Sequence, residues 1–315
     1  MILLELYDVI VIGTGSAGMP AAIYSHRFGL KTLLIGTVVG GTLNESHRVE
    51  NWPGIPAIPG FDLMRRFKEH VDSLGIEVKE EEATAIEKGP DGFTITTEKE
   101  SYRCKAIIFA TGSKHRCLGI PGEERLAGKG VSYCATCDAA FFKTADIAIA
   151  GGGDAAAQAA DLLAQFATEV YVLVRRDAMR AEPINRQRLE QNPKVTILYN
   201  TQPLEVLGEN GVTGLKVTTA GKESVLNVQG FFIEVGADVR SELAEQLGVK
   251  LNEGKEILID GESRTNIPKI YAAGDCASKK FKQAITGAAE GVIAAFSAYE
   301  DLKKLQGEKA ETSYY

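Results

Sequence analysis

The feature that most constrains the fold is a pattern of apolar run, glycine loop and small-residue helix that occurs twice in 315 residues. The first copy covers residues 7–29, YDVIVIGTGSAGMPAAIYSHRFG, and the second covers 145–166, ADIAIAGGGDAAAQAADLLAQF. Each copy reads as a buried strand, a tight turn and a helix. A chain of this length exceeds one hydrophobic core, and the second copy begins about where a second domain has to start. We therefore predict an α/β protein with two Rossmann-like (three-layer ββα) domains.

The first glycine loop has the spacing GxGxxG, formed by Gly13, Gly15 and Gly18. Glycine at these positions permits the tight turn, the approach of a pyrophosphate and close helix packing, while the helix N-terminus attracts phosphate. This predicts a dinucleotide site, with a plain tight turn as the alternative. The acid expected at the end of the second strand is absent, because Ile35 is followed by Gly36 and residues 37–39 are TVV. Either backbone groups hold the ribose, or adenosine binding at this end is weaker.

The second glycine loop, Gly151–Gly153 with Ala156, has the spacing GxGxxA. The strand that follows ends in Arg175 and Arg176, with Arg180 beyond. Guanidinium groups at this position can bind a 2′-phosphate, which favours NADPH over NADH. A solvated basic turn is the alternative. Two such loops in one chain imply two nucleotides and a hydride that moves between them.

Two of the five cysteines, Cys134 and Cys137, have CxxC spacing in SYCATCDAAFF. Zinc needs four ligands, but the other three cysteines stand alone and none of the four histidines is close in sequence. A structural disulfide over so short a loop would contribute little chain-entropy stabilisation. Electron transfer is therefore the favoured interpretation, with zinc and an inert crosslink as alternatives.

Asp138 directly follows the second of these cysteines and is a candidate for handling the proton of a leaving thiolate. The alternative for Asp138 is a helix N-cap. The cysteine pair lies a short loop before the second Rossmann strand, so the dithiol belongs to the same domain as the nicotinamide nucleotide. Nicotinamide and dithiol must then take turns at the other cofactor.

Composition excludes several other classes. The net charge of −7 argues against a nucleic-acid surface, and no run reaches the roughly 18 apolar residues of a membrane span. The apolar N-terminus is interrupted by Glu5 and Asp8 and lacks a basic segment, so we expect a strand and not a signal peptide, in a cytoplasmic protein. Residues 77–98 read as antiparallel strands with a turn at 90–92.

Seven short motifs occur along the chain in this order: GTGSAG, VENWPG, CATCD, GGGDAA, RRDAMRA, YAAGD and KQAIT. On these motifs the chain resembles the low-molecular-weight, prokaryotic-type thioredoxin reductases over nearly its full length. The resemblance implies an FAD domain formed by residues 1–116 and 243–315, with an NADPH domain carrying the CxxC, residues 117–242, inserted between them. It also implies a homodimer and a thioredoxin or thioredoxin-like partner. No metal is expected, because the spacing of the cysteines and histidines does not supply four ligands.

The resemblance also implies roles for particular residues. Cys137 would face the flavin, Cys134 would attack the substrate disulfide, and Asp138 would protonate the released thiolate. The residues implied in FAD binding are Gly13, Gly15, Ser16, Gly18, Gly36, Gly40, Gly41, Thr42, Asn51, Thr111, Gly112, Gly274, Asp275, Gln283 and Ala284. The residues implied in NADPH binding are Gly151, Gly153, Asp154, Ala155, Arg175, Arg176 and Arg180.

The chain departs from the family pattern at two further positions. Thr42 replaces the Gln of a common GGQL, and Val174 replaces the His of a common HRR. The second change leaves NADH or a non-pyridine donor open. Two other readings also stay open, a flavin dithiol oxidase and a non-catalytic flavin redox sensor.

Overall fold

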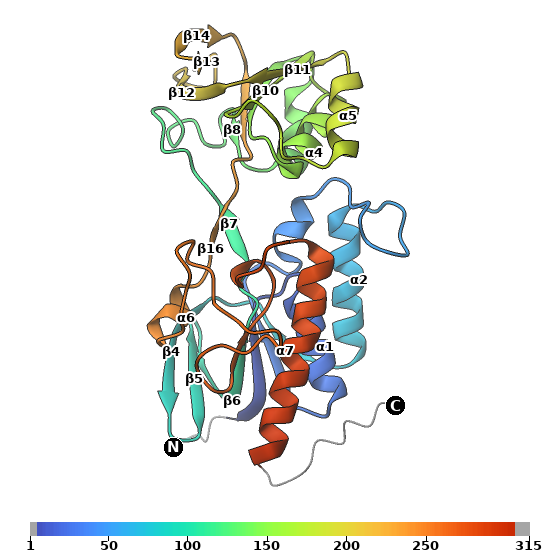
Figure 1. Ribbon diagram of the computed structural model, residues 1–315, viewed down its shortest axis with the longest axis vertical. Coiled ribbons are helices and arrows are strands. Elements are labelled where there is room, and N and C mark those ends of the chain that lie inside the picture. Colours follow the sequence, from blue (N-terminus) through green and yellow to red (C-terminus); the bar gives the residue numbers. More distant parts are fainter. Residues whose placement is uncertain (1–4, 306–315) are drawn as a thin grey trace. The chain divides into compact units, whose positions relative to one another are not determined.

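The computed structural model describes residues 5–305, which divide into two compact units (Figure 1). Within the described residues, the split unit consists of 5–44, 50–114 and 239–305. The inserted unit consists of 45–49 and 115–238. Residues 1–4, at the start of the predicted N-terminal strand, lie outside the described part. The second glycine loop therefore belongs to a unit that interrupts the chain of the first.

The split unit is built on a seven-stranded sheet in the order β3-β2-β1-β6-β5-β4, with β17 paired to β6. Its strands are β1 (Leu6–Ile12), β2 (Thr32–Ile35), β3 (Glu77–Lys79), β4 (Ala83–Gly89), β5 (Gly92–Thr97), β6 (Ser101–Phe109) and β17 (Ile270–Ala272). The β1, β2, β3, β6 and β17 strands run parallel. The β1 and β2 strands are almost wholly buried, as expected of parallel strands covered on both faces.

One sequence-based expectation for this sheet is wrong in part. The antiparallel pair predicted within residues 77–98 is present as β4 and β5, but β3 pairs parallel with β2. Residues 80–82 separate β3 from β4 and carry three glutamates in succession. Alternation of apolar and polar residues predicts strands but not which strands pair. The sequence pattern therefore did not show that the chain leaves one strand pair at this acidic segment and begins another.

Helices cover this sheet and bring its C-terminal segment onto the first glycine loop. They are α1 (Gly18–Arg27), α2 (Gly60–Ser73), α6 (Glu242–Gln246) and α7 (Ala284–Leu305), with short 3-10 turns η1 (Gly41–Glu45) and η3 (Gly274–Cys276). The α7 helix packs on α1, where a Cβ at Gly291 would lie 2.2 Å from the carbonyl oxygen of Ala17. Glycine at that crossing allows the two backbones to touch.

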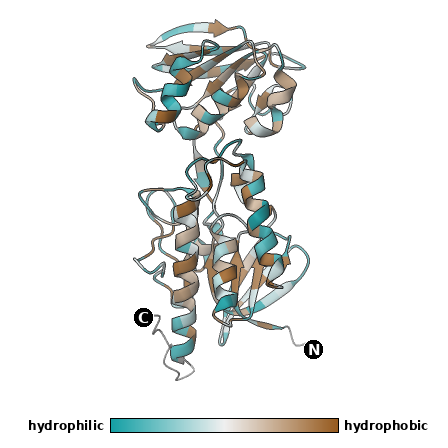
Figure 2. Ribbon diagram, turned by 90° about the vertical axis from the view of Figure 1, so that its right-hand side faces the viewer, coloured by the Kyte–Doolittle hydropathy of each residue, from teal (hydrophilic) through white to brown (hydrophobic). Residues whose placement is uncertain are grey.

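The inserted unit has a five-stranded, all-parallel sheet in the order β11-β10-β9-β15-β8 and a separate antiparallel sheet β12-β13-β14. Its strands are β8 (Val131–Ser132), β9 (Asp146–Ala150), β10 (Glu169–Val174), β11 (Val195–Tyr199), β12 (Thr201–Leu207), β13 (Gly214–Thr219), β14 (Lys222–Leu226) and β15 (Gly230–Ile233). Its helices are α3 (Ala135–Asp138), η2 (Ala139–Phe142), α4 (Asp154–Leu163) and α5 (Pro183–Gln191). The central strands of the five-stranded sheet, β9, β10 and β15, are mostly buried, and Figure 2 shows apolar residues on strands of this unit.

Two strands carry the chain between the units, β7 (Ser113–His115) and β16 (Ala237–Val239), and they pair in a two-stranded sheet. A short segment that sequence reasoning did not set apart, Glu45–Val49, groups with the inserted unit. Across residues 5–305, no helix combines the length and the apolar character needed to cross a membrane.

Candidate active site

The first glycine loop contains glycines required by the protein and one that the protein leaves open. A Cβ at Gly13 would lie 2.0 Å from the Ala110 carbonyl oxygen, and one at Gly18 would lie 1.7 Å from the Gly13 carbonyl oxygen. At Gly15 the nearest protein atoms would be 3.9 Å away. Packing therefore explains Gly13 and Gly18, while the bare backbone at Gly15 is available to a ligand, as a pyrophosphate site requires.

Segments far apart in sequence meet around this loop. The amide of Gly40 donates to the carbonyl of Thr14 at 2.9 Å, and a Cβ at Gly41 would lie 3.3 Å from the Cα of Gly15. Asn51 donates from Nδ2 to Oε1 of Gln283 at 3.0 Å. The structure thus places Gly40 and Gly41 against the first glycine loop and pairs Asn51 with Gln283 within the split unit.

The YAAGD segment adds a half-buried carboxyl group, that of Asp275, to the split unit. Burial raises the pKa of Asp275, while the Lys282 charge lowers it in part. Lys282 donates to the backbone carbonyl of Asp275 at 2.8 Å, and no protein donor reaches the Asp275 carboxylate within residues 5–305. A cradle with an open glycine and a half-buried carboxyl group that has no protein donor in the described chain fits a ligand that carries phosphate and hydroxyl groups, such as FAD.

The absent acid after β2 has a structural reason that the sequence did not reveal. Thr14 is buried and donates from Oγ1 to the carbonyl of Val38 at 2.8 Å. A Cβ at Gly36 would lie 2.8 Å from that same Oγ1. The Thr14 side chain therefore fills the space that an acidic side chain at position 36 would need.

The remaining predicted residues of the split unit have varied surroundings. Ser16, Gln283 and Ala284 are half-buried and Thr42 is exposed. Thr111 donates from Oγ1 to the carbonyl of Arg240, and Gly112 accepts from the Arg240 amide at 3.1 Å. The last two residues therefore also anchor the returning chain.

The second glycine loop repeats the pattern of the first. A Cβ at Gly151 would lie 2.5 Å from the Glu234 carbonyl oxygen, whereas at Gly153 it would meet no atom within 4 Å. Gly153 is the N-cap of α4, so its open backbone lies where the helix dipole attracts an anion. Beside it, Ala155 is exposed and Asp154 accepts hydrogen bonds from the Glu182 amide.

The three predicted arginines of the inserted unit, Arg175, Arg176 and Arg180, have exposed side chains. Within the described chain their guanidinium groups have no ion pair or hydrogen bond to protein, so they are available to an anionic ligand. Val174 is buried, and its Cγ1 would lie 3.1 Å from a Cβ at Gly152. The replacement of His by Val therefore places a packing residue under the glycine loop and leaves the arginines in place.

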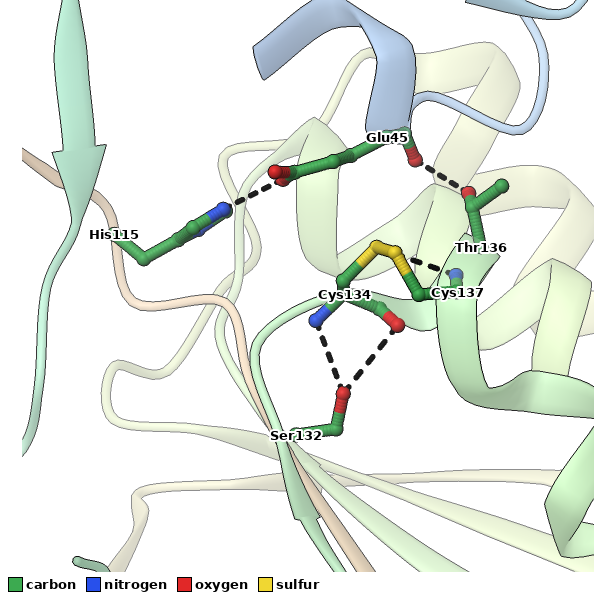
Figure 3. The surroundings of a disulfide bond; sticks show 6 residues. All are labelled: Glu45, His115, Ser132, Cys134, Thr136 and Cys137. Carbon is green, nitrogen blue, oxygen red and sulfur yellow. Dashed lines mark hydrogen bonds and ion pairs between the residues drawn. A yellow bond between two sulfur atoms is a disulfide. The ribbon is translucent and has the colours of Figure 1, made fainter. Parts of the chain in front are cut away.

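Cys134 and Cys137 form a disulfide with a Cα to Cα distance of 5.3 Å, on the short α3 turn (Figure 3). Cys134 is half-buried and Cys137 is exposed. The Cys137 amide donates to Cys134 Sγ at 3.2 Å. Ser132 Oγ accepts from the Cys134 amide at 3.1 Å and donates to the Cys134 carbonyl at 3.3 Å. After reduction, the Cys137 amide would stabilise a thiolate at Cys134.

Asp138 occupies the N-cap position of η2 without making a side-chain capping hydrogen bond. Its half-buried carboxylate has no hydrogen-bond partner within residues 5–305. The capping alternative therefore does not explain this residue, and its side chain is free to handle a proton.

Three acidic and basic side chains of the inserted unit that the sequence analysis missed lie near one another. Glu45 Oε2 and His115 Nε2 are 2.6 Å apart, and Thr136 donates from Oγ1 to the Glu45 carbonyl (Figure 3). The Glu45 hydrogen bond raises the pKa of His115. Burial raises the pKa of Glu234 to about 7, with His115 lowering it and Glu45 raising it. An acid directly after the apolar run GFFI was the one sequence signal for Glu234.

The other three cysteines form no disulfide, and two of them are buried. Burial raises the pKa of Cys104 to about 12 and also raises that of Cys276, so both remain thiols. Cys117 is exposed and makes no disulfide. In the part of the chain that the structure describes, no group of three or more His, Cys, Asp or Glu side chains is arranged to hold a metal ion.

Comparisons with known proteins agree with this geometry. The Pyridine nucleotide-disulphide oxidoreductase family matches residues 7–291. A thioredoxin reductase of Listeria monocytogenes is 39% identical over 306 residues, which is 96% of either chain. The crystal structure of Lactococcus lactis thioredoxin reductase (FR conformation) matches with a TM-score of 0.92 and 39% identity, covering 95% of this chain and 99% of that one.

A thioredoxin reductase structure from T. acidophilum is similar too, with a TM-score of 0.91, 34% identity and coverage of 94% of this chain and 99% of that one. These similarities confirm the prediction of two Rossmann-like domains, the second inserted in the first. The match over residues 7–291 places both glycine loops, the disulfide and the YAAGD segment within one family pattern. The chain therefore belongs to the pyridine nucleotide-disulphide oxidoreductase family.

Proposed function

We propose that the protein is a thioredoxin reductase that passes electrons from NADPH, by way of FAD, to the Cys134–Cys137 disulfide and then to a thioredoxin. The observation that carries this proposal is the accessible disulfide on the same compact unit as the second glycine loop. Each glycine loop keeps one glycine, Gly15 or Gly153, that no protein contact requires. Two ligand cradles and one dithiol are the parts that such a relay needs.

Each nucleotide has a proposed place. We assign FAD to residues 1–116 and 243–315 and NADPH to residues 117–242. Around FAD, the chain offers the Gly15 backbone, the half-buried Asp275 carboxyl group and the Asn51–Gln283 pair. When bound, the two nucleotides would supply the hydride transfer and the electron pair that reduces the Cys134–Cys137 disulfide.

The dithiol completes the reaction by thiol–disulfide exchange. One thiolate attacks a sulfur of the partner disulfide, forming a mixed disulfide and releasing a partner thiolate that Asp138 protonates. The second cysteine then attacks the mixed disulfide, which restores Cys134–Cys137 and frees the reduced partner. Attack by Cys134 stays our prediction, and its stabilised thiolate supports it. The greater exposure of Cys137 favours the reverse order.

Single-cysteine variants separate the two orders. Cys137→Ser should trap a mixed disulfide with a thioredoxin that has lost its own resolving cysteine if Cys134 is the attacker. Cys134→Ser should trap the mixed disulfide if Cys137 is the attacking cysteine. Mass spectrometry of the non-reduced complex identifies the bonded residue.

A protein substrate fits the surface next to the disulfide. Phe141 follows Cys137 by one helical turn and is 82% exposed, which is unusual for so large an apolar side chain. We expect Phe141→Ala to raise the KM for thioredoxin about tenfold while leaving reduction of a small aromatic disulfide unchanged, because a buried aromatic anchor is worth 1–2 kcal/mol or more. Equal effects on both substrates would argue against Phe141 as a docking residue.

The homodimer is also proposed from the family resemblance, and a cytoplasmic location is proposed beside it. Cys104, Cys117 and Cys276 form no disulfide, which suits a reducing compartment. Sedimentation equilibrium of the yellow protein tests the dimer: a mass of a single 33.9 kDa chain at micromolar concentration would contradict it.

An anaerobic titration tests the whole proposal against its rivals. NADPH should bleach the bound flavin faster than NADH does, and oxidised thioredoxin should restore the colour with turnover. A dithiol oxidase would be reoxidised by oxygen and not by thioredoxin. A redox sensor would show no turnover with any dithiol partner, and protein that takes up no flavin would refute the proposal.

A further inference from the structure

The loop that carries the three arginines is fastened to the second glycine loop. We call residues 175–182, RRDAMRAE, the arginine loop. The amides of Arg180 and Ala181 both donate to the carbonyl of Gly152, at 2.6 and 3.2 Å. Met179 and Ala181 are buried in the core of the inserted unit, so the chain on either side of Arg180 is held. Its guanidinium group points to solvent with no protein partner in the described chain.

A single carboxylate oxygen, Oδ1 of Asp154, holds the C-terminal end of the arginine loop. Asp154, the first residue of α4, accepts at Oδ1 from the Glu182 amide and from Asn185 Nδ2, each at 2.8 Å. Asn185 is only 8% exposed, so its amide depends on this acceptor. Glu182 ends the arginine loop and Asn185 lies in the first turn of α5. The Asp154 side chain therefore ties the start of one helix to the end of the loop and to the next helix.

These contacts give Asp154 a role that its position in the glycine motif does not imply. Its Oδ1 accepts both hydrogen bonds from protein groups, so these contacts set the orientation of the Asp154 side chain. We propose that Asp154 is a positioning residue for nucleotide choice: it fixes the arginine loop in the arrangement that receives the 2′-phosphate. This inference rests on the proposed use of NADPH.

The sign of the effect distinguishes positioning from simple electrostatics. A carboxylate close to a phosphate repels it, so removing the Asp154 charge would strengthen phosphate binding if charge alone mattered. Positioning predicts the opposite, because a released loop must be ordered again each time the ligand binds. Asn at position 154 retains a carbonyl Oδ1 that can accept from both donors, whereas Ala retains no acceptor.

The experiment uses the full-length protein with its flavin and compares binding of 2′,5′-ADP with binding of AMP by isothermal titration calorimetry. Asp154→Ala should bind 2′,5′-ADP about tenfold more weakly, the effect of losing one charge-assisted contact, and bind AMP unchanged. The KM for NADPH should rise by the same factor with kcat retained. Asp154→Asn should restore most of the affinity, and Asn185→Ala should show a smaller loss in the same direction.

A matched control comes from the same helix. Asp161 is half-buried on α4 and its carboxylate has no hydrogen-bond partner in the described chain. Asp161→Ala makes the same change of charge and should leave the preference for 2′,5′-ADP intact. If that variant loses the preference as well, the loss does not depend on the hydrogen bonds that Asp154 makes, and the inference is overturned.

Three other outcomes are decisive. An unchanged or stronger preference for 2′,5′-ADP in Asp154→Ala would overturn the inference alone, because wild-type selectivity would still support the arginine site. An equal loss for AMP and 2′,5′-ADP would overturn it too, since the whole nucleotide site would then have collapsed. Wild-type protein that binds both ligands equally would refute the choice of NADPH itself. If Asp154→Ala does not fold, Asn185→Ala must show the selective loss.

Discussion

Glu234 gives a pH-dependent stability that a single substitution should remove. It follows β15 directly, its amide donates to the Ala150 carbonyl at 2.8 Å, and burial raises its pKa from 4.5 to about 7. The folded protein therefore binds the Glu234 proton more tightly than the unfolded chain does. Stability from this group is complete below about pH 4.5 and declines as the pH rises to about 7.

The size of this decline follows from the shift. At 1.36 kcal/mol for each pKa unit, a change from 4.5 to about 7 corresponds to about 3 kcal/mol. Gln has nearly the same shape as Glu and no charge. The free energy of unfolding of Glu234→Gln should therefore be close to that of the wild type near pH 5 and larger than that of the wild type at pH 8. In a protein of this size about 3 kcal/mol corresponds to a Tm difference of roughly 6 °C or more.

Thermal unfolding followed by circular dichroism at several pH values between 5 and 9 measures this difference. Glu124→Gln is the matched control, because Glu124 is exposed in the same unit and its side chain has no partner within residues 5–305. The control should melt with the wild type at every pH. A Glu234→Gln advantage that does not grow between pH 5 and 8, or a variant less stable than the wild type at pH 8, would refute the reasoning.

Three further predictions concern other parts of the molecule. Gly15→Ala should fold normally, since its Cβ would meet no protein atom nearer than 3.9 Å, yet purify with little flavin, at about tenfold lower affinity or worse; normal flavin absorbance would contradict this. His115→Gln removes the pairing with Glu45, whose hydrogen bond raises the His115 pKa. That pair stabilises the fold below about pH 6.5 and the benefit disappears as the pH rises through the folded pKa, so the variant's deficit in Tm should shrink toward pH 9. Arg264→Ala breaks a two-point contact with Asp301 at 3.1 and 3.2 Å, and urea unfolding should show a loss of about 2 kcal/mol, whereas an unchanged midpoint would contradict the assignment.

The sequence predicted the parts of the fold that local patterns encode. Strand, glycine loop and helix follow each other within 25 residues at both loops, so spacing alone located Gly15 and Gly153. The CxxC spacing likewise located the disulfide that the structure contains.

Contacts between distant residues account for what the sequence did not predict. Thr14 reaches the carbonyl of Val38, 24 positions away, and Asp154 reaches Asn185, 31 positions away. Neither pair has a spacing rule, because each depends on how two strand–helix units pack. The parallel pairing of β3 and the Glu45–His115 contact belong to the same class.

The division of the chain bears on the order in which it folds during synthesis. The split unit lacks β17 and α7 until residues 270–305 leave the ribosome, although its first strand is made at the outset. The inserted unit is complete once Asp238 has emerged. Since domains fold as units, the inserted unit should fold before the split unit, although its synthesis begins later. The first strands of the split unit cannot complete their sheet until β17 has been synthesised. Truncation near residue 240 should therefore yield a folded disulfide module attached to an unfinished flavin domain.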